Sequence, residues 1–232
     1  MNNNNIFNSS YINKYGYNFD YYEPQEDSYL FVDLLNELSL TNKVILDLGC
    51  STCILTNQVK KNNIVISTDI NIKALEAVSN STNNTNNTNN NTDNTNTDYN
   101  LILTNMFDYI NLSYFDIILF NAPYVPSEEI EEYKDTNMGG TILEGGKEGS
   151  EVINKFMNNI VEYYNKINIT NENNIINNNL IVYLLVIKAN NINNIHNIHN
   201  IHNIHNINNI NISLVKTKKI LGETIEIYKI KL

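Results

Sequence analysis

The 232-residue chain has no tryptophan and no arginine, and its 15 basic residues are all lysines. Asparagine, isoleucine, lysine and tyrosine are abundant instead, a pattern that we attribute to codon bias in an A/T-rich genome. The formal net charge is -10, whereas proteins that hold nucleic acid by its phosphates carry clustered positive charge. Basic residues gather only in short pairs such as Lys218 and Lys219. Nucleic acid is therefore a disfavoured substrate.

Long apolar runs, cysteines and targeting features are also scarce. No apolar run approaches the roughly 18 residues of a membrane span. Residues 1–20 lack a basic segment followed by an apolar core, so no secretory signal is expected. Two cysteines do not make a disulfide framework in a chain of this length. We expect a protein of the reducing cytoplasm, or of the nucleus as well.

Three segments are of low complexity. Residues 80–98 are almost entirely Asn, Thr, Ser and Asp, and because they offer no apolar surface they predict a disordered surface loop. Residues 168–179 are a shorter case. In residues 190–210 isoleucine recurs at every third position, which fits neither a helix nor a strand and indicates a repeat expansion. The alternative is a metal-binding tract formed by His196, His199, His202 and His205.

The rest of the chain alternates between helix and strand patterns, which predicts an α/β fold with helices on both faces of a mostly parallel sheet. Helices are predicted at 24–38, 54–60, 71–79 and 149–166, and strands at 43–49, 63–70, 100–105, 115–120, 180–187, 211–219 and 223–231. Three residues join the last two strands, too few for a crossover, so these strands form an antiparallel hairpin. We expect a disordered tail at 1–20 and a single domain at 21–232, interrupted by the low-complexity insertions.

Polar residues stand at or beside the ends of four predicted strands, namely Asp47, Asp69, Asn105 and Asn121. In an open α/β sheet, ligands bind at the carboxyl ends of the strands. Asp69 follows Asp47 by 22 residues, the spacing at which a second-strand carboxylate binds the hydroxyls of a nucleoside ribose. An N-cap for the following helix is the alternative for Asp69, and we favour the ribose role.

The loop after the first strand, "DLGCSTC" at 47–53, retains only Gly49 of the glycines typical of a dinucleotide site. Small residues would still let the backbone approach a ligand that has no phosphate. Cys50 and Cys53 form a C-x-x-C, but the sequence shows no partners for a zinc or redox role. We favour simple packing of the loop and expect no metal site.

The segment "FNAPYVPS" at 120–127 holds two of the chain's three prolines directly after an apolar run. Together with other motifs it resembles the class I S-adenosylmethionine-dependent methyltransferases, and among them the HemK-type glutamine methyltransferases of the eukaryotic and archaeal branch. "NAPY" resembles N-P-P-Y, and "YEPQEDSYLFVDLL" at 22–35 resembles the Y-E-P-x-E-D-[ST] motif of that branch. "DLGCSTC" stands at the D/E-x-G-x-G-x-G loop, "TDIN" at the second-strand end, "GGKEGSEV" at a Gly-Gly-x-x-Gly segment and "GETIEIYKIK" at the terminal hairpin. N-P-P-Y also occurs in adenine-N6 DNA methyltransferases. It is the combination with the N-terminal motif that narrows the resemblance to the HemK-type enzymes.

The resemblance implies a Rossmann-like class I methyltransferase with a seven-stranded sheet and a substrate site at residues 121–124. A primary amide is a poor nucleophile, so such a site must hold and aim its NH2 group. In the family, the side-chain oxygen of Asn121 and the main-chain carbonyl of Ala122 would accept its two hydrogens, and Tyr124 would pack on the planar group. Ala122 replaces a proline without removing a functional atom, and Pro123 still stiffens the corner.

The resemblance also implies S-adenosylmethionine as the cofactor. Ser28 and Asp47 would lie near its methionine end with Gly49 beneath, Asp69 would bind the ribose, Asn105 and Met106 would border the adenine, and Asn121 would also border the cofactor. Here Asn105 replaces the usual aspartate of the family, and it can still accept a hydrogen bond from the adenine amino group.

The implied reaction is methylation of glutamine N5 in the Gly-Gly-Gln motif of the eukaryotic class I release factor. A lysine substrate, adenine N6 in DNA, and a non-catalytic binding subunit remain alternatives. The resemblance further implies that the uncharged strand "YNLILTN" at 99–105 lies at a sheet edge and pairs with a small zinc-binding activator subunit, which would hold the zinc. In the other interpretation, the neighbouring Asn-rich loop folds back over this edge.

Overall fold

The structure, a computed structural model, describes residues 20–86, 98–126, 144–170, 179–190 and 210–232. The histidine-rich tract, residues 1–19 of the expected tail and residues 87–97 of the Asn-rich segment lie outside the described residues.

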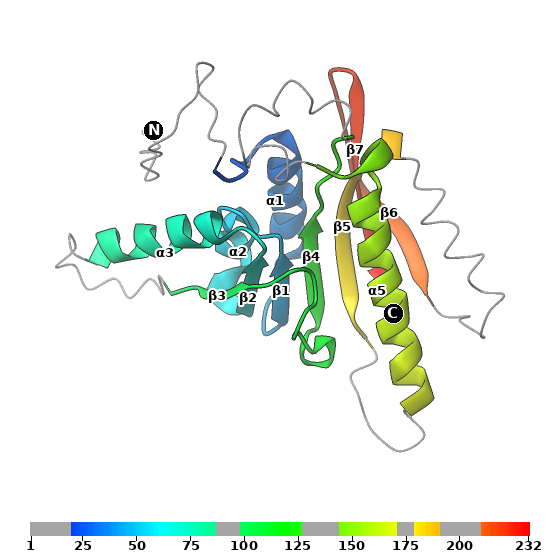
Figure 1. Ribbon diagram of the computed structural model, residues 1–232, viewed down its shortest axis with the longest axis horizontal. Coiled ribbons are helices and arrows are strands. Elements are labelled where there is room, and N and C mark those ends of the chain that lie inside the picture. Colours follow the sequence, from blue (N-terminus) through cyan, green and yellow to red (C-terminus); the bar gives the residue numbers. More distant parts are fainter. Residues whose placement is uncertain (1–19, 87–97, 127–143, 171–178, 191–209) are drawn as a thin grey trace.

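A seven-stranded sheet runs through the described residues in the order β3-β2-β1-β4-β5-β7-β6 (Figure 1). Its strands are β1 (Val44–Leu48), β2 (Ile64–Asp69), β3 (Asn100–Leu103), β4 (Ile117–Asn121), β5 (Ile181–Ile187), β6 (Asn211–Ile220) and β7 (Glu223–Lys231). The first five pair in parallel, and β7 runs antiparallel to both β5 and β6. The predicted fold class and the C-terminal hairpin are confirmed, and β3 lies at the sheet edge where it was expected.

The parallel register aligns the ends of the central strands. Leu48, the last residue of β1, pairs with Thr68 on one side and with Phe120 on the other. Asp69 follows Thr68 and Asn121 follows Phe120. Both therefore lie at the carboxyl ends of the parallel strands, one on each side of β1. Short apolar strands that are buried on both faces make this register well determined.

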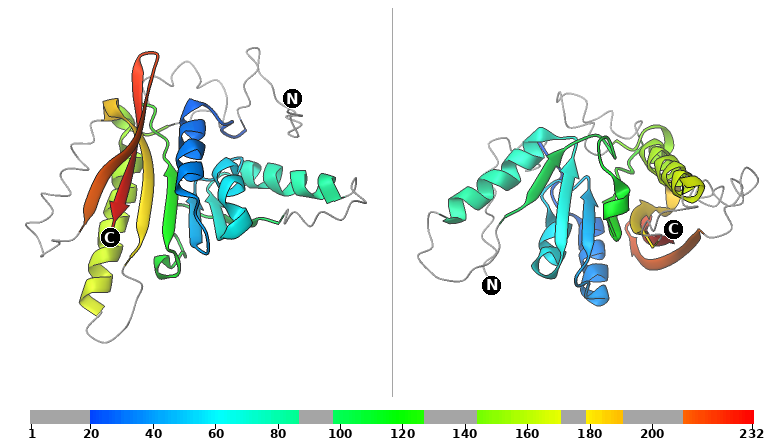
Figure 2. Two further views of the ribbon diagram at one scale, coloured as in Figure 1. Left: turned by 180° about the vertical axis from the view of Figure 1, so that it is seen from behind. Right: turned by 90° about the horizontal axis from the view of Figure 1, so that it is seen from below.

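Two hydrophobic cores form on opposite faces because successive side chains of a strand alternate in direction. On one face α1 (Glu26–Leu38) and α2 (Ile54–Val59) pack against residues such as Ile45 and Leu119. On the other, α5 (Glu151–Thr170) packs against Leu46 and Phe120. Figure 2 shows the two groups of helices separated by the sheet in the view from below. No helix in the described ranges is both long and apolar enough to span a bilayer.

Several predicted boundaries are wrong. The Asn-rich segment was expected to be a loop from residue 80, but α3 (Ile72–Asn86) continues through its first seven residues and projects away from the sheet (Figure 1). Likewise α5 includes residues 168–170. Extending an existing helix adds one hydrogen bond per residue, so modest helix formers such as Asn and Thr can continue what they would not nucleate. The first helix begins at Glu26 and not at residue 24.

Three residues at the borders of the predicted tail and of the isoleucine repeat have defined places in the structure. Asp20, assigned to the tail, makes defined contacts with α3. Asn190 and Ile210, assigned to the repeat, are both buried, with 5% and 8% of their surface exposed. Composition alone does not identify such border residues, because an asparagine or isoleucine next to an Asn- and Ile-rich repeat cannot be distinguished from the repeat itself.

Candidate functional site

A cavity of about 680 Å³ lies at the carboxyl ends of β1, β2 and β4. Its volume is within the range of small-molecule sites, roughly 300–1,000 Å³. All of the site residues predicted from the sequence line it: Ser28, Asp47, Gly49, Asp69, Asn105, Met106, Asn121, Ala122, Pro123 and Tyr124. The fold therefore brings these residues together around one hollow.

Asp69 ends β2 with both carboxylate oxygens in use. Oδ2 accepts a hydrogen bond from the Ser51 main-chain N–H at 2.8 Å, and Oδ1 accepts from the Asn71 N–H at 2.8 Å. The first turn of α3 is capped instead by Asn71, whose Oδ1 accepts from the Lys73 N–H at 3.1 Å. The N-cap interpretation of Asp69 is thus wrong. Burial raises the pKa of the Asp69 carboxyl, and the backbone hydrogen bonds oppose that shift.

Asp47 lines the cavity and is only 1% exposed. Its Oδ2 accepts from the Thr56 N–H at 3.0 Å and from Thr56 Oγ1 at 2.6 Å, and Thr56 Oγ1 lies 2.7 Å from Ser67 Oγ. Burial raises the pKa of Asp47 to about 7, while the hydrogen bonds from Thr56 act in the opposite direction. Asp47 therefore ties the end of β1 to α2 as well as lining the cavity.

The loop between β1 and α2 adopts left-handed backbone geometry at Gly49, Ser51 and Cys53, with φ of 65°, 42° and 59°. Cys50 and Cys53 are buried free thiols that pack against Leu75 and Val78 of α3, as the packing interpretation predicted. Among the described residues there is no group of three or more His, Cys, Asp or Glu side chains that could hold a metal ion.

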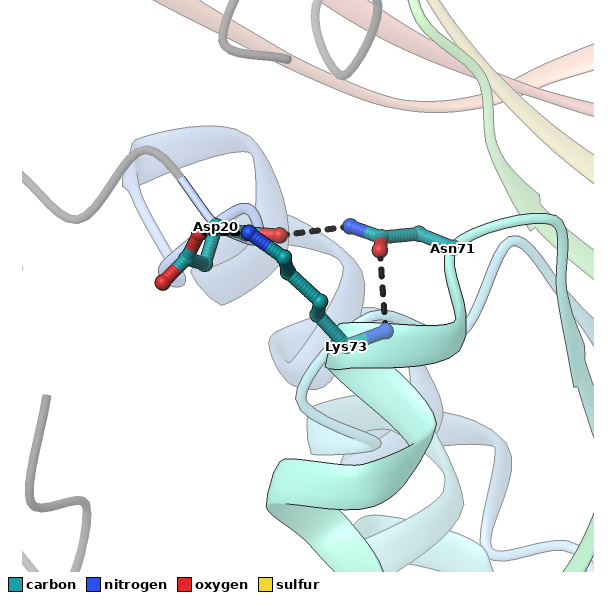
Figure 3. A network of polar contacts seen from close by, with 3 residues as sticks. All are labelled: Asp20, Asn71 and Lys73. Atoms are coloured by element: carbon teal, nitrogen blue, oxygen red, sulfur yellow. Dashed lines mark hydrogen bonds and ion pairs between the residues drawn. The ribbon is translucent and has the colours of Figure 1, made fainter. Parts of the chain in front are cut away.

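The segment before α1 crosses this loop and contacts the start of α3. Asn71 Nδ2 donates to the Asp20 main-chain oxygen at 2.6 Å, and Lys73 Nζ forms an ion pair with Asp20 Oδ1 at 2.6 Å (Figure 3). Ser51 Oγ donates to the Tyr22 main-chain oxygen at 2.8 Å. These contacts hold residues 20–22 beside the cavity, and the Tyr22 side chain lines it.

Asp27 is the centre of a hydrogen-bond network that sequence reasoning did not include in the site. Its Oδ1 accepts from Tyr22 OH at 2.7 Å, from the Ser28 N–H at 2.6 Å and from Ser28 Oγ at 3.3 Å. Its Oδ2 accepts from Asn121 Nδ2 at 3.0 Å and from Tyr124 OH at 3.3 Å. The signal was present in the Y-E-P-x-E-D-[ST] motif, which contains both Tyr22 and Asp27.

The two tyrosines of this network remain donors at neutral pH. Burial, reinforced by the nearby Asp27 carboxylate, raises the pKa of Tyr22 and of Tyr124 well above the usual value of 10.0. Both phenol groups therefore keep the hydrogens that they donate to Asp27.

Asn121 has a determined side-chain orientation. Asp27 accepts from its Nδ2, so the other end of the amide, Oδ1, must point away from Asp27. This Oδ1 is buried and has no hydrogen-bond partner among the described residues. An unpaired buried acceptor costs about 1–3 kcal/mol, and a ligand that donates an N–H to it removes that cost. The geometry thus presents an acceptor for a donor group at residues that line the cavity.

Asn105 and Met106 lie just beyond the end of β3, which is shorter than predicted. Asn105 is exposed, and Met106 turns the chain with φ of 51°. Both still line the cavity beside Asp69.

These residues fit S-adenosylmethionine. Asp69 lines the cavity, and each of its oxygens, besides the backbone hydrogen bond that it accepts, has a second lone pair for a ribose hydroxyl. Gly49 lines the cavity with left-handed backbone geometry. A Cβ at Gly49 would meet the Phe120 ring at 3.5 Å, an ordinary contact, so it is the backbone geometry that favours glycine there. Ser28 and Asp47 add polar groups to the cavity lining, and Asn121 supplies the unpaired acceptor.

Comparison with known proteins gives a consistent result. Residues 19–145 match the family described as methyltransferase small domain, which is more than half of the chain. A Methanocaldococcus jannaschii protein with the provisional name protein N5-glutamine methyltransferase is 28% identical over 147 residues, 62% of this chain and 67% of its own.

Solved structures are also similar. The structure of the E. cuniculi Mtq2–Trm112 complex, described as responsible for methylation of the eRF1 translation termination factor, contains a chain with 32% identity and a TM-score of 0.59. That match covers 91% of this chain and 98% of the other. A ribosomal protein L11 methylase from Lactobacillus delbrueckii subsp. bulgaricus matches with a TM-score of 0.51 at 12% identity, over 90% of this chain and 79% of its own, which shows likeness of fold alone.

Proposed function

Because the chain belongs to the methyltransferase small-domain family and is a HemK-type methyltransferase, we propose that it methylates the side-chain amide nitrogen of a glutamine in a translation termination factor. One relative, provisionally named a protein N5-glutamine methyltransferase, supports the glutamine, and the other, from a complex described as methylating eRF1, supports the termination factor. The Gly-Gly-Gln loop of the release factor is the target that the sequence resemblance implies.

The observation that carries this proposal is the unpaired Asn121 Oδ1. A glutamine amide presents two N–H donors in one plane. Asn121 Oδ1 would accept one and the Ala122 carbonyl the other, so the nitrogen is fixed while its lone pair stays free. Tyr124, whose OH donates to Asp27, would hold its ring against the planar amide.

The cofactor would be held by Asp69 at its ribose, by Gly49, Ser28 and Asp47 toward its methionine end, and by Asn105 and Met106 at its adenine. When bound, S-adenosylmethionine supplies an electrophilic methyl group that joins the amide nitrogen as its bond to sulfur breaks. The nitrogen gains one bond to carbon and gives up one proton. Neither Asn121 nor the Ala122 carbonyl is basic enough to keep that proton, so it passes to water.

A methyl-transfer assay with release factor, histone and DNA as substrates tests the proposal directly. We expect methylation of release factor at glutamine, lost when that glutamine is changed to glutamate. Asn121→Ala should lower turnover by roughly 10²–10³. The same variant should keep most of its affinity for S-adenosylmethionine by calorimetry, because Asp69 and the 49–53 loop are untouched. Methylation of histone or DNA, or turnover close to normal in Asn121→Ala, would contradict the assignment.

We propose in addition that β3 pairs with a small activator subunit, which the resemblance predicts to be zinc-binding. The strand is at the sheet edge, and Ile102 and Leu103 are 39% and 53% exposed although both are apolar. An apolar edge strand with unpaired backbone groups favours addition of a further strand. In support, the similar E. cuniculi protein was solved as a complex with Trm112.

Co-expression followed by size-exclusion chromatography tests this pairing. The chain should form a soluble one-to-one complex with the activator, and Leu103→Lys should weaken it. Lys43→Glu, a charge change just outside β1, serves as a control that leaves the edge unchanged. A chain that methylates release factor at full rate without any partner would refute the pairing.

A further inference from the structure

Residues 121–124, which we call the substrate corner, leave the sheet directly after Asn121. Asn121 still pairs with Leu185 in β5. Beyond it, the main chain is held at Val125, whose oxygen accepts from the Gly145 N–H at 2.8 Å. Between these points the carbonyl of Ala122 and the ring of Tyr124 need another fixed contact if they are to meet a substrate at constant geometry.

Asn190 supplies that contact. It lies 5% exposed at the end of a 3-10 helix, η5 (Lys188–Asn190), that follows β5. Its Nδ2 donates to the Tyr124 main-chain oxygen at 2.9 Å, with the Gly149 and Glu148 oxygens at 3.2 and 3.4 Å. Its Oδ1 accepts from the Ile187 N–H at 3.1 Å. Donor and acceptor ends of the amide are both used, so its orientation is unambiguous.

Gly149 completes this arrangement. It has φ of 68°, and a Cβ built there would lie 2.0 Å from the Tyr124 oxygen and 2.6 Å from Asn190 Nδ2. Only glycine therefore allows the 145–149 segment, the Tyr124 carbonyl and the Asn190 amide to meet. The Tyr124 residue is thus fixed at two points, by its OH on Asp27 and by its carbonyl on Asn190.

We propose that Asn190, with Gly149 packed against it, is a positioning residue that sets the geometry of the substrate corner. The inference rests on the proposed function for its consequence in catalysis. Asn190 touches neither the cavity nor the reacting atoms, so it acts through Tyr124 and the adjoining carbonyl of Ala122. A displacement of about 1 Å at such a site can cost roughly 10²-fold in rate.

The chain offers a matched control for the test. Asn63 has a bonding pattern similar to that of Asn190: its Nδ2 donates to two main-chain oxygens, those of Leu40 and Val59, at 2.9 and 2.8 Å, where Asn190 has three such oxygens within reach. Its Oδ1 accepts from the Lys43 N–H at 2.9 Å. Asn63 precedes β2 and so lies at the end of the sheet opposite to the cavity. Asn63→Ala therefore removes a comparable set of side-chain to main-chain bonds without touching the corner.

The experiment compares Asn190→Ala, Gly149→Ala and Asn63→Ala with the parent chain, together with any partner that the parent requires for activity. Measurements are kcat and KM for a glutamine substrate, S-adenosylmethionine affinity, and backbone hydrogen exchange, all at a temperature where each variant is folded. We expect kcat/KM to fall by roughly 10²-fold in the first two variants and by less than threefold in Asn63→Ala. Cofactor affinity should change less than threefold in all of them. In Asn190→Ala, exchange at the Gly145 and Ile187 amides should quicken while the β1 amides stay protected.

Equal kcat/KM in Asn190→Ala and Asn63→Ala, or unchanged exchange at Gly145, would overturn the inference. A parent chain that methylates no glutamine substrate would refute the proposed function instead. The exchange comparison would then still decide whether Asn190 fixes the corner, because it needs no substrate.

Discussion

Asp27→Asn is the change that most directly probes the site, because it exchanges one oxygen for NH2 in a side chain that only accepts. The new NH2 must face one of two sides. On the Oδ1 side it would meet three donors, including the Ser28 main-chain N–H at 2.6 Å, which cannot turn away. On the Oδ2 side it meets only Asn121 Nδ2 and Tyr124 OH, and both can reorient. We therefore expect the new NH2 group to occupy the Oδ2 position.

The consequence for Asn121 is a flip of its amide. With NH2 in place of the Asp27 Oδ2, Asn121 would turn its oxygen toward residue 27 and point its own NH2 where Oδ1 had been. When a glutamine substrate entered, its NH2 group would then face the NH2 group of Asn121 and would lose its acceptor there. Loss of one such orienting contact costs roughly 10²–10³ in turnover, or about 2.7–4 kcal/mol in the barrier. Stability should fall by about 1–3 kcal/mol, because the network is buried.

Methyl transfer to release factor measures the loss, and thermal unfolding measures the stability. Glu26→Gln is the matched control: it makes the same chemical change one residue earlier, at an exposed side chain paired with Lys218. Its turnover should stay within twofold of the parent. The double variant Asp27→Asn/Asn121→Asp restores a donor opposite an acceptor and should recover at least part of the lost rate. If the double variant is no faster than Asp27→Asn, the orientation argument is refuted.

Three further predictions concern the cofactor side and the insertions. Asp69→Ala should lose S-adenosylmethionine affinity in calorimetry; affinity equal to the parent's would exclude the ribose role. For Asp47, the native pKa of about 7 exceeds the ordinary value of 3.8, so the folded chain keeps a proton that the unfolded chain releases. Its contribution to stability therefore falls as pH rises from about 4 to about 7, and Asp47→Asn should flatten that part of the pH–stability curve; identical slopes in both chains would show that Asp47 titrates normally. Replacing residues 87–96 by a Gly-Ser linker, which leaves α3 whole, should keep methyl transfer within a few-fold, since lengthening or shortening such a loop costs little, about 0.6 kcal/mol per doubling. A collapse of activity with the fold intact would mean that these residues contact substrate or partner.

The sequence was sufficient for the strands and for most of the cavity lining. Periodicity and apolar runs predicted the strand boundaries to within two residues, because strands such as β1 and β4 are buried on both faces and leave little choice of register. Because these strands are parallel, Asp69 and Asn121 lie together at their carboxyl ends, independently of how the loops fold.

The sequence was insufficient where a residue acts through contacts distant along the chain. Asp27 bonds with Asn121, 94 positions later, and Asn190 with Tyr124, 66 positions earlier. Nothing in the local pattern separates Asp27 from Glu26, or Asn190 from the asparagines that follow it. Only the folded chain shows which of them is buried with its hydrogen bonds complete.

The 49–53 loop has a consequence for how sequence searches identify members of this family. Ser51 and Cys53 hold left-handed backbone geometry, a conformation that costs non-glycine residues about 1–3 kcal/mol. Each side chain has a compensating contact: Ser51 Oγ bonds to the Tyr22 carbonyl, and Cys53 is buried against α3. The glycine spacing of the motif thus records a backbone shape, which other small residues can also adopt. A search that scores φ angles at these positions would recover divergent members that a search for the letter G passes over.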